Sequence, residues 1–120
     1  MNKVVHINST FYGKTATIIL DDGYAYVMVT ILKDTPSVAA IHDLVVHIDK
    51  RGQGLGGILL EEACKAGEGM GADTIMLSVI PGSWLEEWYK RHGFRDIGEK
   101  ETVFGVMHRV MEKKCNEENN

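Results

Sequence analysis

The sequence predicts an α/β (α+β) fold in a single domain. Strand-like runs come first, an amphipathic helix follows a glycine-rich turn, and strand and helix then alternate to the end. A chain of 120 residues with 44% hydrophobic and 25% charged residues has the composition of an ordinary globular domain with one core. We therefore expect one domain over residues 1–112 and a polar tail at 113–120.

The first third of the chain has the pattern of antiparallel strands. Residues 24–32 alternate between two faces, and residues 15–20 before them are rich in β-branched side chains. Between these runs, Asp22-Gly23 is typical of a tight hairpin turn. A third long strand is expected over residues 38–48.

The second half of the chain predicts helices between strands. Apolar residues recur at helical spacing over residues 55–70, and residues 74–80 form an apolar, strand-like run. Ser83 and Glu86 match a capping box, which predicts that a second helix starts there. A final strand is expected over residues 102–111.

The most informative segment is LVVHIDKRGQGLGG at residues 44–57. An apolar run leads into a turn with glycines at 52, 54, 56 and 57, which allow positive φ or the close approach of a ligand. The first N–H groups of the following helix have no intrahelical partners, and the helix dipole there favours negative charge. We therefore expect the turn to bind a pyrophosphate.

Two common phosphate-binding motifs fit this turn poorly. Gly52, Gly54 and Gly57 match G-x-G-x-x-G, but a dinucleotide-binding fold places that motif after its first strand and needs a longer chain. A Walker loop ends in Gly-Lys-Ser/Thr, whereas this turn ends in Gly56-Gly57-Ile58.

Two motifs carry a family resemblance. Residues 51–56, RGQGLG, fit Q/R-x-x-G-x-G/A, and residues 88–94, WYKRHGF, are similar to an aromatic-Tyr-x-x-x-Gly-Phe segment. On these motifs the chain resembles the GNAT superfamily of acyl-CoA-dependent N-acetyltransferases over about residues 38–98. The resemblance implies a mixed, mostly antiparallel sheet with helices packed on it. The two helices that the family usually inserts after its first strand have no room here, because only residues 8–14 separate the first two apolar runs.

The resemblance also implies a site for acetyl-CoA as co-substrate. The N–H groups of residues 52–57 would hold the pyrophosphate, the backbone of residues 44–46 would pair with the pantetheine, and the Val46 N–H would face the thioester oxygen. The implied cofactor-binding residues are Leu44, Val45, Val46, Arg51, Gly52, Gln53, Gly54, Leu55, Gly56, Gly57 and Tyr89. Basic residues near the two motifs suit an anionic cofactor, although scattered surface charge explains them almost as well: Lys50, Arg51, Lys90, Arg91 and Arg95.

Two residues are candidates for proton transfer. By resemblance, Tyr89 would protonate the departing thiolate, and His42 would relay the proton of the amine. Each also has a structural interpretation, Tyr89 as a half-buried packing residue and His42 as an ordinary strand histidine. His42 and Asp43 lie where glucosamine-phosphate acetyltransferases carry an acidic pair, a similarity that hints at a substrate.

The chain departs from the family at two further positions. Gly82 stands where many members have an asparagine that contacts the cofactor, and Leu77 stands where some protein-acetylating members have a base glutamate. Trp84 and Trp88 lie four residues apart on one helix face, which favours core or cofactor-flanking packing.

The composition argues against several other functions. A formal net charge of −4 gives no bulk attraction to nucleic acid or acidic membranes, and the N-terminus turns polar before an apolar stretch reaches signal-peptide length. We expect a cytoplasmic protein with reduced thiols at Cys64 and Cys115. No metal site is expected, because His42 and His47 would point to opposite faces of a strand.

The sequence thus favours an N-acetyltransferase that transfers acetyl from acetyl-CoA to a primary amine by direct attack. The acceptor is a small-molecule amine or an amine of a peptide or protein, in a pocket that is open or completed by a second subunit in a homodimer. The alternatives are an inactive acyl-CoA-binding or interaction module of the same fold and, less favoured, a dinucleotide binder.

Overall fold

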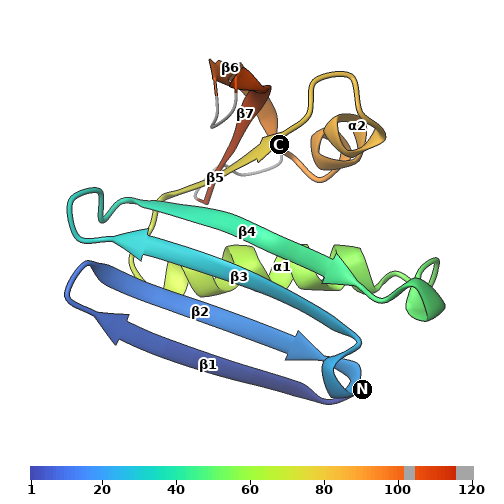
Figure 1. Ribbon diagram of the computed structural model, residues 1–120. Helices are drawn as coiled ribbons and strands as arrows, with labels where there is room; N and C mark the ends of the chain where they lie inside the picture. Colours follow the sequence, from blue (N-terminus) through green and yellow to red (C-terminus); the bar gives the residue numbers. More distant parts are fainter. Residues whose placement is uncertain (102–104, 116–120) are drawn as a thin grey trace.

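The computed structural model describes residues 1–101 and 105–115. Within these residues a seven-stranded sheet has the order β1-β2-β3-β4-β5-β7-β6. All neighbouring strands are antiparallel except β4 and β5, so the predicted mixed, mostly antiparallel sheet is confirmed (Figure 1). The strands are β1 (Lys3–Thr10), β2 (Gly13–Leu20), β3 (Ala25–Leu32), β4 (Val38–Val46), β5 (Thr74–Val79), β6 (Arg95–Glu101) and β7 (Met107–Lys114), and the helices are α1 (Leu55–Gly69) and α2 (Trp84–Arg91).

The first four strands form a continuous antiparallel meander. Thr10 pairs with Gly13, so a two-residue turn joins β1 to β2 and no helix lies between them, as expected. Between β2 and β3, the predicted turn contains a short 3-10 helix, Asp21–Gly23. The two helices that family members usually insert after their first strand are thus absent between β1 and β2, as the sequence predicted.

The core lies between this sheet and α1. Alternate residues of β2 and β3 face the helix and are at most 6% exposed, as period-two alternation requires: Ala16, Ile18, Leu20, Val27, Val29 and Ile31. Gly67 explains how closely α1 packs, because a Cβ there would lie 2.6 Å from Cδ1 of Ile75. The glycine that weakens the helix locally thus permits its contact with the sheet.

Both helices lie on the same face of the sheet. In the β5–β7 register, Leu77 pairs with Met111 and Val79 with Arg109, so these side chains share the face on which α1 contacts Ile75. Arg109 in turn contacts Glu86 of α2. Within residues 1–101 and 105–115, no helix covers the opposite face.

Several predicted boundaries were wrong. β4 ends at Val46, and residues 48–50 form a 3-10 helix that starts the turn. A strand at Arg95–Glu101 was missed because its charged sequence, RDIGEKE, does not alternate. β7 runs to Lys114, which pairs with Thr74, so the strand extends past the expected boundary at 112; residues 102–104 and 116–120 lie outside the described part.

The predicted capping box does not form. The Ser83 hydroxyl donates to the carbonyl oxygen of Ile80 at 2.7 Å, and the Glu86 carboxylate accepts from the N–H of Gly82 at 3.1 Å. The helix still starts after Ser83, but Glu86 has a tertiary role described below. None of the helices in the described ranges is both long and apolar enough to cross a bilayer.

Candidate active site

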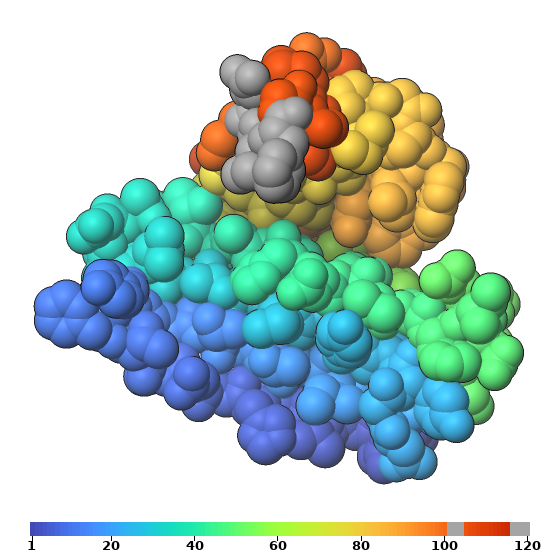
Figure 2. Space-filling view, viewed as in Figure 1, coloured from blue at the N-terminus to red at the C-terminus, as the bar shows by residue number. Residues whose placement is uncertain are grey.

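A groove opens where β4 and β5 stop pairing. Their parallel ladder joins residues 38–40 to residues 74–76 and does not continue, although β4 runs on to Val46. In Figure 2 the part of the molecule that contains α2 stands apart from the segment around residues 44–57. The groove has a volume of about 490 Å³ and is lined by Leu44, Val45, Val46, Lys50, Arg51, Gly52, Gly54, Leu55, Gly56, Gly57, Trp84, Leu85 and Trp88.

The groove lining agrees closely with the predicted cofactor residues. Every residue of that set lines the groove except Gln53, which is exposed on the turn, and Tyr89. Trp84, Leu85 and Lys50 join them. The spacing of Trp84 and Trp88, four residues apart on one helix, is the feature of the sequence that indicates the side of the groove formed by α2.

A bulge in β4 shapes the first wall. Tyr26 pairs with Val45 and Met28 with His42, so Asp43 and Leu44 both lie opposite the one residue between them on β3. Asp43 has a φ of 57°, which is uncommon for a non-glycine residue and costs about 1 to 3 kcal/mol. The bulge reorients the end of β4 beside the groove.

The geometry after the bulge directs the Val46 backbone into the groove. The His47 N–H donates to the Tyr24 carbonyl on β3 at 2.7 Å. Since successive N–H groups of a strand point to opposite sides, the Val46 N–H points away from β3. Consistent with this, the Val46 carbonyl accepts from Nε of Arg51 at 3.0 Å on that side.

The glycine turn presents the start of α1 to the groove. Gly52 and Gly54 have φ values of 81° and 84°, in the left-handed region that favours glycine. A Cβ at either position would meet nothing within 4 Å, so backbone conformation rather than packing requires these glycines. Gly54 is the N-cap of α1, which has no side-chain cap and no acidic residue in its first turn. The amides of Leu55 and the next residues are therefore available to an anion.

Aromatic side chains form the second wall. Trp84 is 72% exposed, and the rings of Trp88 and His92 are in contact at a tilt of 51°, with 4.4 Å between their centroids. A Cβ on Gly56 would lie 3.5 Å from the Trp88 ring, so α2 packs directly against the first turn of α1. Burial, together with Lys113 and Arg91, lowers the pKa of His92, so that His92 is neutral at physiological pH.

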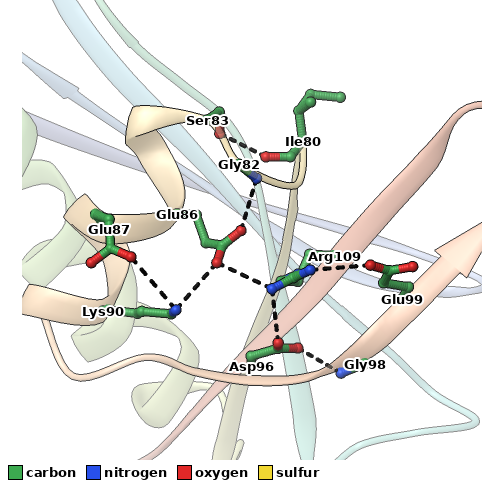
Figure 3. A network of polar contacts seen from close by, with 10 residues as sticks. All are labelled: Ile80, Gly82, Ser83, Glu86, Glu87, Lys90, Asp96, Gly98, Glu99 and Arg109. Carbon is green, nitrogen blue, oxygen red and sulfur yellow. Dashed lines mark hydrogen bonds and ion pairs between the residues drawn. The ribbon is translucent and has the colours of Figure 1, made fainter.

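An ion-pair network fixes the position of this wall (Figure 3). One carboxylate oxygen of the buried Glu86 accepts from the Gly82 N–H, and the other lies 3.2 Å from both Lys90 and Arg109. The Gly82 N–H and Lys90 hold the pKa of Glu86 below its ordinary value. Arg109 also pairs, at 3.1 Å each, with Asp96 and Glu99. The network links α2 to β6 and β7, and the sequence did not predict it.

Tyr89 is buried and does not line the groove. The residue is 7% exposed. The centroid of its ring lies 5.1 Å from that of Trp88 and 5.7 Å from that of Phe94. Burial raises the pKa of the phenol, so it is protonated at neutral pH.

His42 lies on the face of the sheet without a helix. Its side chain is 45% exposed, with Nε2 2.7 Å from the Thr30 hydroxyl and Nδ1 3.8 Å from the Asp43 carboxylate. The Thr30 hydroxyl also lies 3.0 Å from that of Thr15. His42 is thus held at the bulge but accessible.

The expected basic cluster is dispersed. Lys50 and Arg51 line the groove, with Lys50 3.5 Å from Asp21. Lys90 pairs with Glu86, and Arg95 pairs with Glu112 at 2.9 Å. Lys50 and Arg51 therefore lie beside the groove, whereas Lys90 and Arg95 are held in ion pairs.

A second cavity of about 510 Å³ lies beside α1 and shares Gly54 and Gly57 with the groove. It contains Cys64 and Cys115, and burial raises the pKa of both thiols, that of Cys64 to about 11. These thiols are protonated and poorly nucleophilic at neutral pH. In the part of the chain that the structure describes, no group of three side chains could hold a metal ion.

The sequence matches the family model for the acetyltransferase (GNAT) domain over residues 8–96. The chain belongs to the GNAT acetyltransferase family. Acyl transfer is the general chemistry of this family, and it is therefore the general chemistry of this protein. No curated protein matches the chain.

Solved GNAT structures share the fold. An acyl-CoA N-acyltransferase from Pseudomonas aeruginosa is 28% identical, with 84% of this chain and 69% of that chain covered at a TM-score of 0.69. Nourseothricin acetyltransferase is 19% identical, with coverage of 96% and 85% and a TM-score of 0.70. A GNAT family acetyltransferase from Elizabethkingia anophelis with acetyl-CoA bound is 11% identical, with coverage of 94% and 98% and a TM-score of 0.73.

Proposed function

We propose that the protein transfers an acetyl group from acetyl-CoA to a primary amine, and that the groove between β4 and α2 binds the donor. The diphosphate binds the amides of residues 52–57, and the pantetheine lies along residues 44–46. One observation carries the proposal: the uncapped start of α1 and the outward-pointing Val46 N–H open into the same groove. The fold match to a GNAT structure with acetyl-CoA bound supports the choice of donor.

Direct attack of the amine on the thioester fits these groups. The nitrogen forms a bond to the carbonyl carbon, the carbon–sulfur bond breaks, the nitrogen loses a proton and the thiolate gains one. The Val46 N–H stabilises the negative charge that develops on the carbonyl oxygen. A fixed donor of this kind is worth about 2.7 to 4 kcal/mol in a transition state.

Two side chains exchange the protons. His42 accepts the proton of the amine through its exposed ring, held by Thr30. Tyr89 supplies the proton to the thiolate, and its raised pKa keeps it protonated until the sulfur leaves. A positioned acid or base contributes roughly 10²- to 10⁴-fold to the rate.

The acceptor approaches from the face of the sheet on which His42 is exposed. A small-molecule amine and a peptide or protein amine both remain candidates, because no helix among the described residues walls this face. Release of free CoA thiol, measured with a panel of amines, amino sugars and peptides, tests the activity. Binding of acetyl-CoA is tested separately by calorimetry, and no heat at millimolar ligand would contradict the proposal.

A second candidate is an acyl-CoA-binding module without catalysis. The position of Tyr89 favours it, because this side chain packs edge-to-face against Trp88 and does not line the groove. Binding of acetyl-CoA without thiol release for any acceptor would support this candidate over the enzyme.

A further inference from the structure

Three polar side chains form a continuous row on the face of the sheet where His42 is exposed. Thr15 of β2 lies directly opposite Thr30 of β3. Thr30 is in turn the diagonal neighbour of His42, because Met28 pairs with His42 and Thr30 with Ala40. Oγ1 of Thr30 lies 3.0 Å from Oγ1 of Thr15 and 2.7 Å from Nε2 of His42. Hydrogen bonds therefore connect all three side chains.

The Asp43 carboxylate indicates which ring nitrogen of His42 carries the proton. At the bulge in β4, Oδ2 of Asp43 lies 3.8 Å from Nδ1 of His42. This is too far for a direct hydrogen bond, but a negative charge at that distance favours a proton on Nδ1. A neutral imidazole has one donor and one acceptor nitrogen, so Nε2 is then the acceptor.

The contact between Thr30 and His42 agrees with this tautomer. A ring N–H that donates to oxygen typically gives an N···O distance of about 2.9 to 3.0 Å. The observed 2.7 Å instead fits the Thr30 hydroxyl donating to Nε2. Because Thr30 has a single proton to donate, the Thr15 hydroxyl must donate to Thr30. One lone pair of the Thr30 oxygen then remains free to accept a proton from an amine.

We propose that Thr30 is a catalytic residue that relays the proton of the amine to His42. The Thr30 oxygen takes the proton while its own proton passes to Nε2 of His42. One N–H and one O–H bond break and one of each forms, so the amine loses a proton, the hydroxyl is regenerated and His42 becomes an imidazolium. The charge lies beside Asp43, and the side chains of His42 and Asp43 are 45% and 63% exposed, so the proton can then leave to solvent.

The tautomer of His42 tests the relay in the protein without ligand. Two-bond proton–nitrogen correlation spectra of protein with isotopically labelled histidine report which ring nitrogen is protonated, and the His42 signal is assigned by its loss in His42→Gln. We expect neutral His42 to carry its proton on Nδ1. Thr30→Val removes the donor to Nε2 and should produce a mixture of both tautomers. A wild-type proton on Nε2, or an unchanged tautomer in Thr30→Val, would overturn the relay.

Turnover tests the same relay during the reaction. Thr30→Val keeps a β-branched side chain on the strand but removes the hydroxyl, so turnover should fall by about 100-fold with acetyl-CoA affinity unchanged. Thr30→Ser should recover most of the rate. Thr17→Val is the matched control, since Thr17 lies on the same face opposite Met28, and it should turn over as the wild type does. Full turnover in Thr30→Val, or an equal loss in Thr30→Ser or Thr17→Val, would contradict the role of Thr30.

The two measurements separate this inference from the proposed function on which it rests. A wild type that releases no thiol with any acceptor contradicts both the acetyl transfer and the relay. A wild type that releases thiol but shows the opposite tautomer, or no loss of turnover in Thr30→Val, contradicts the relay alone.

Discussion

The two walls of the groove are built in different ways. The wall from β4 through the turn to α1 offers main-chain N–H groups, exposed by two glycines with positive φ and by the bulge at Asp43. The α2 wall offers tryptophan side chains, and it is held in place by the ion pair between Glu86 and Arg109, two residues that are far apart in sequence. We infer that the first wall supplies affinity and oxyanion stabilisation, whereas the second positions the cofactor. Substitutions on each wall can separate these roles.

The largest effect is expected at Gly54. The variant Gly54→Asp places a carboxylate beside the diphosphate, and two charges about 5 Å apart near a protein surface repel by about 3 kcal/mol. Affinity for CoA, measured by calorimetry, should fall by more than about 100-fold. Gly54→Asn is the matched control, because asparagine tolerates positive φ similarly but carries no charge. Equal losses in both variants would show that strain, not charge, weakens binding.

A smaller effect, on rate rather than affinity, is expected at Tyr89. Tyr89→Phe keeps the buried ring but removes the acid, so turnover should fall by about 100-fold with little change in acetyl-CoA affinity. Steady-state kinetics and calorimetry on the same preparation check this. An unchanged turnover would leave Tyr89 with a packing role alone.

The exposed tryptophan of the α2 wall should affect affinity modestly. Trp84→Ala should weaken CoA binding by roughly fivefold, about 1 kcal/mol of lost aromatic contact. Stability should change by less than about 0.5 kcal/mol, because Trp84 is 72% exposed. Tryptophan fluorescence reports both quantities, since Trp84 and Trp88 are the two tryptophans of the chain. A large loss of stability would contradict the exposed position of Trp84.

Disruption of the ion-pair network around Glu86 should have the smallest effect on CoA binding. Its effect should appear instead in the stability of the fold at acidic pH. The pKa of Glu86 lies below its ordinary value of 4.5, so its stabilising contribution is full above that pH and is lost as pH falls through the folded-state pKa. Glu86→Gln should lower the melting temperature at neutral pH and flatten its fall below pH 4.5. Glu87→Gln, on the exposed side of α2, is the control and should behave as the wild type. If the melting temperatures of the wild type and Glu86→Gln fell in parallel as the pH is lowered, Glu86 would have no such role in acid stability.

The difference between the walls also explains what the sequence predicted. The sequence predicted Gly52 and Gly54 as cofactor-binding residues because a turn and the start of a helix are determined by residues that are adjacent in sequence. Glu86 was misassigned to a capping box because its true partner, Arg109, is 23 residues away in sequence and meets it only in the folded chain. The strand at 95–101 was missed since edge strands with many charges lose the alternation by which strands are recognised.

The proposed function depends on binding of the CoA diphosphate by the amides at the start of α1. Titration of the labelled protein with CoA, followed by amide chemical shifts, tests it most directly. We predict the largest changes at Gly54, Leu55, Gly56 and Gly57, with a further change at Val46 when acetyl-CoA replaces CoA. Changes centred instead on Cys64 and Cys115 in the second cavity, or none at all, would contradict the proposed binding.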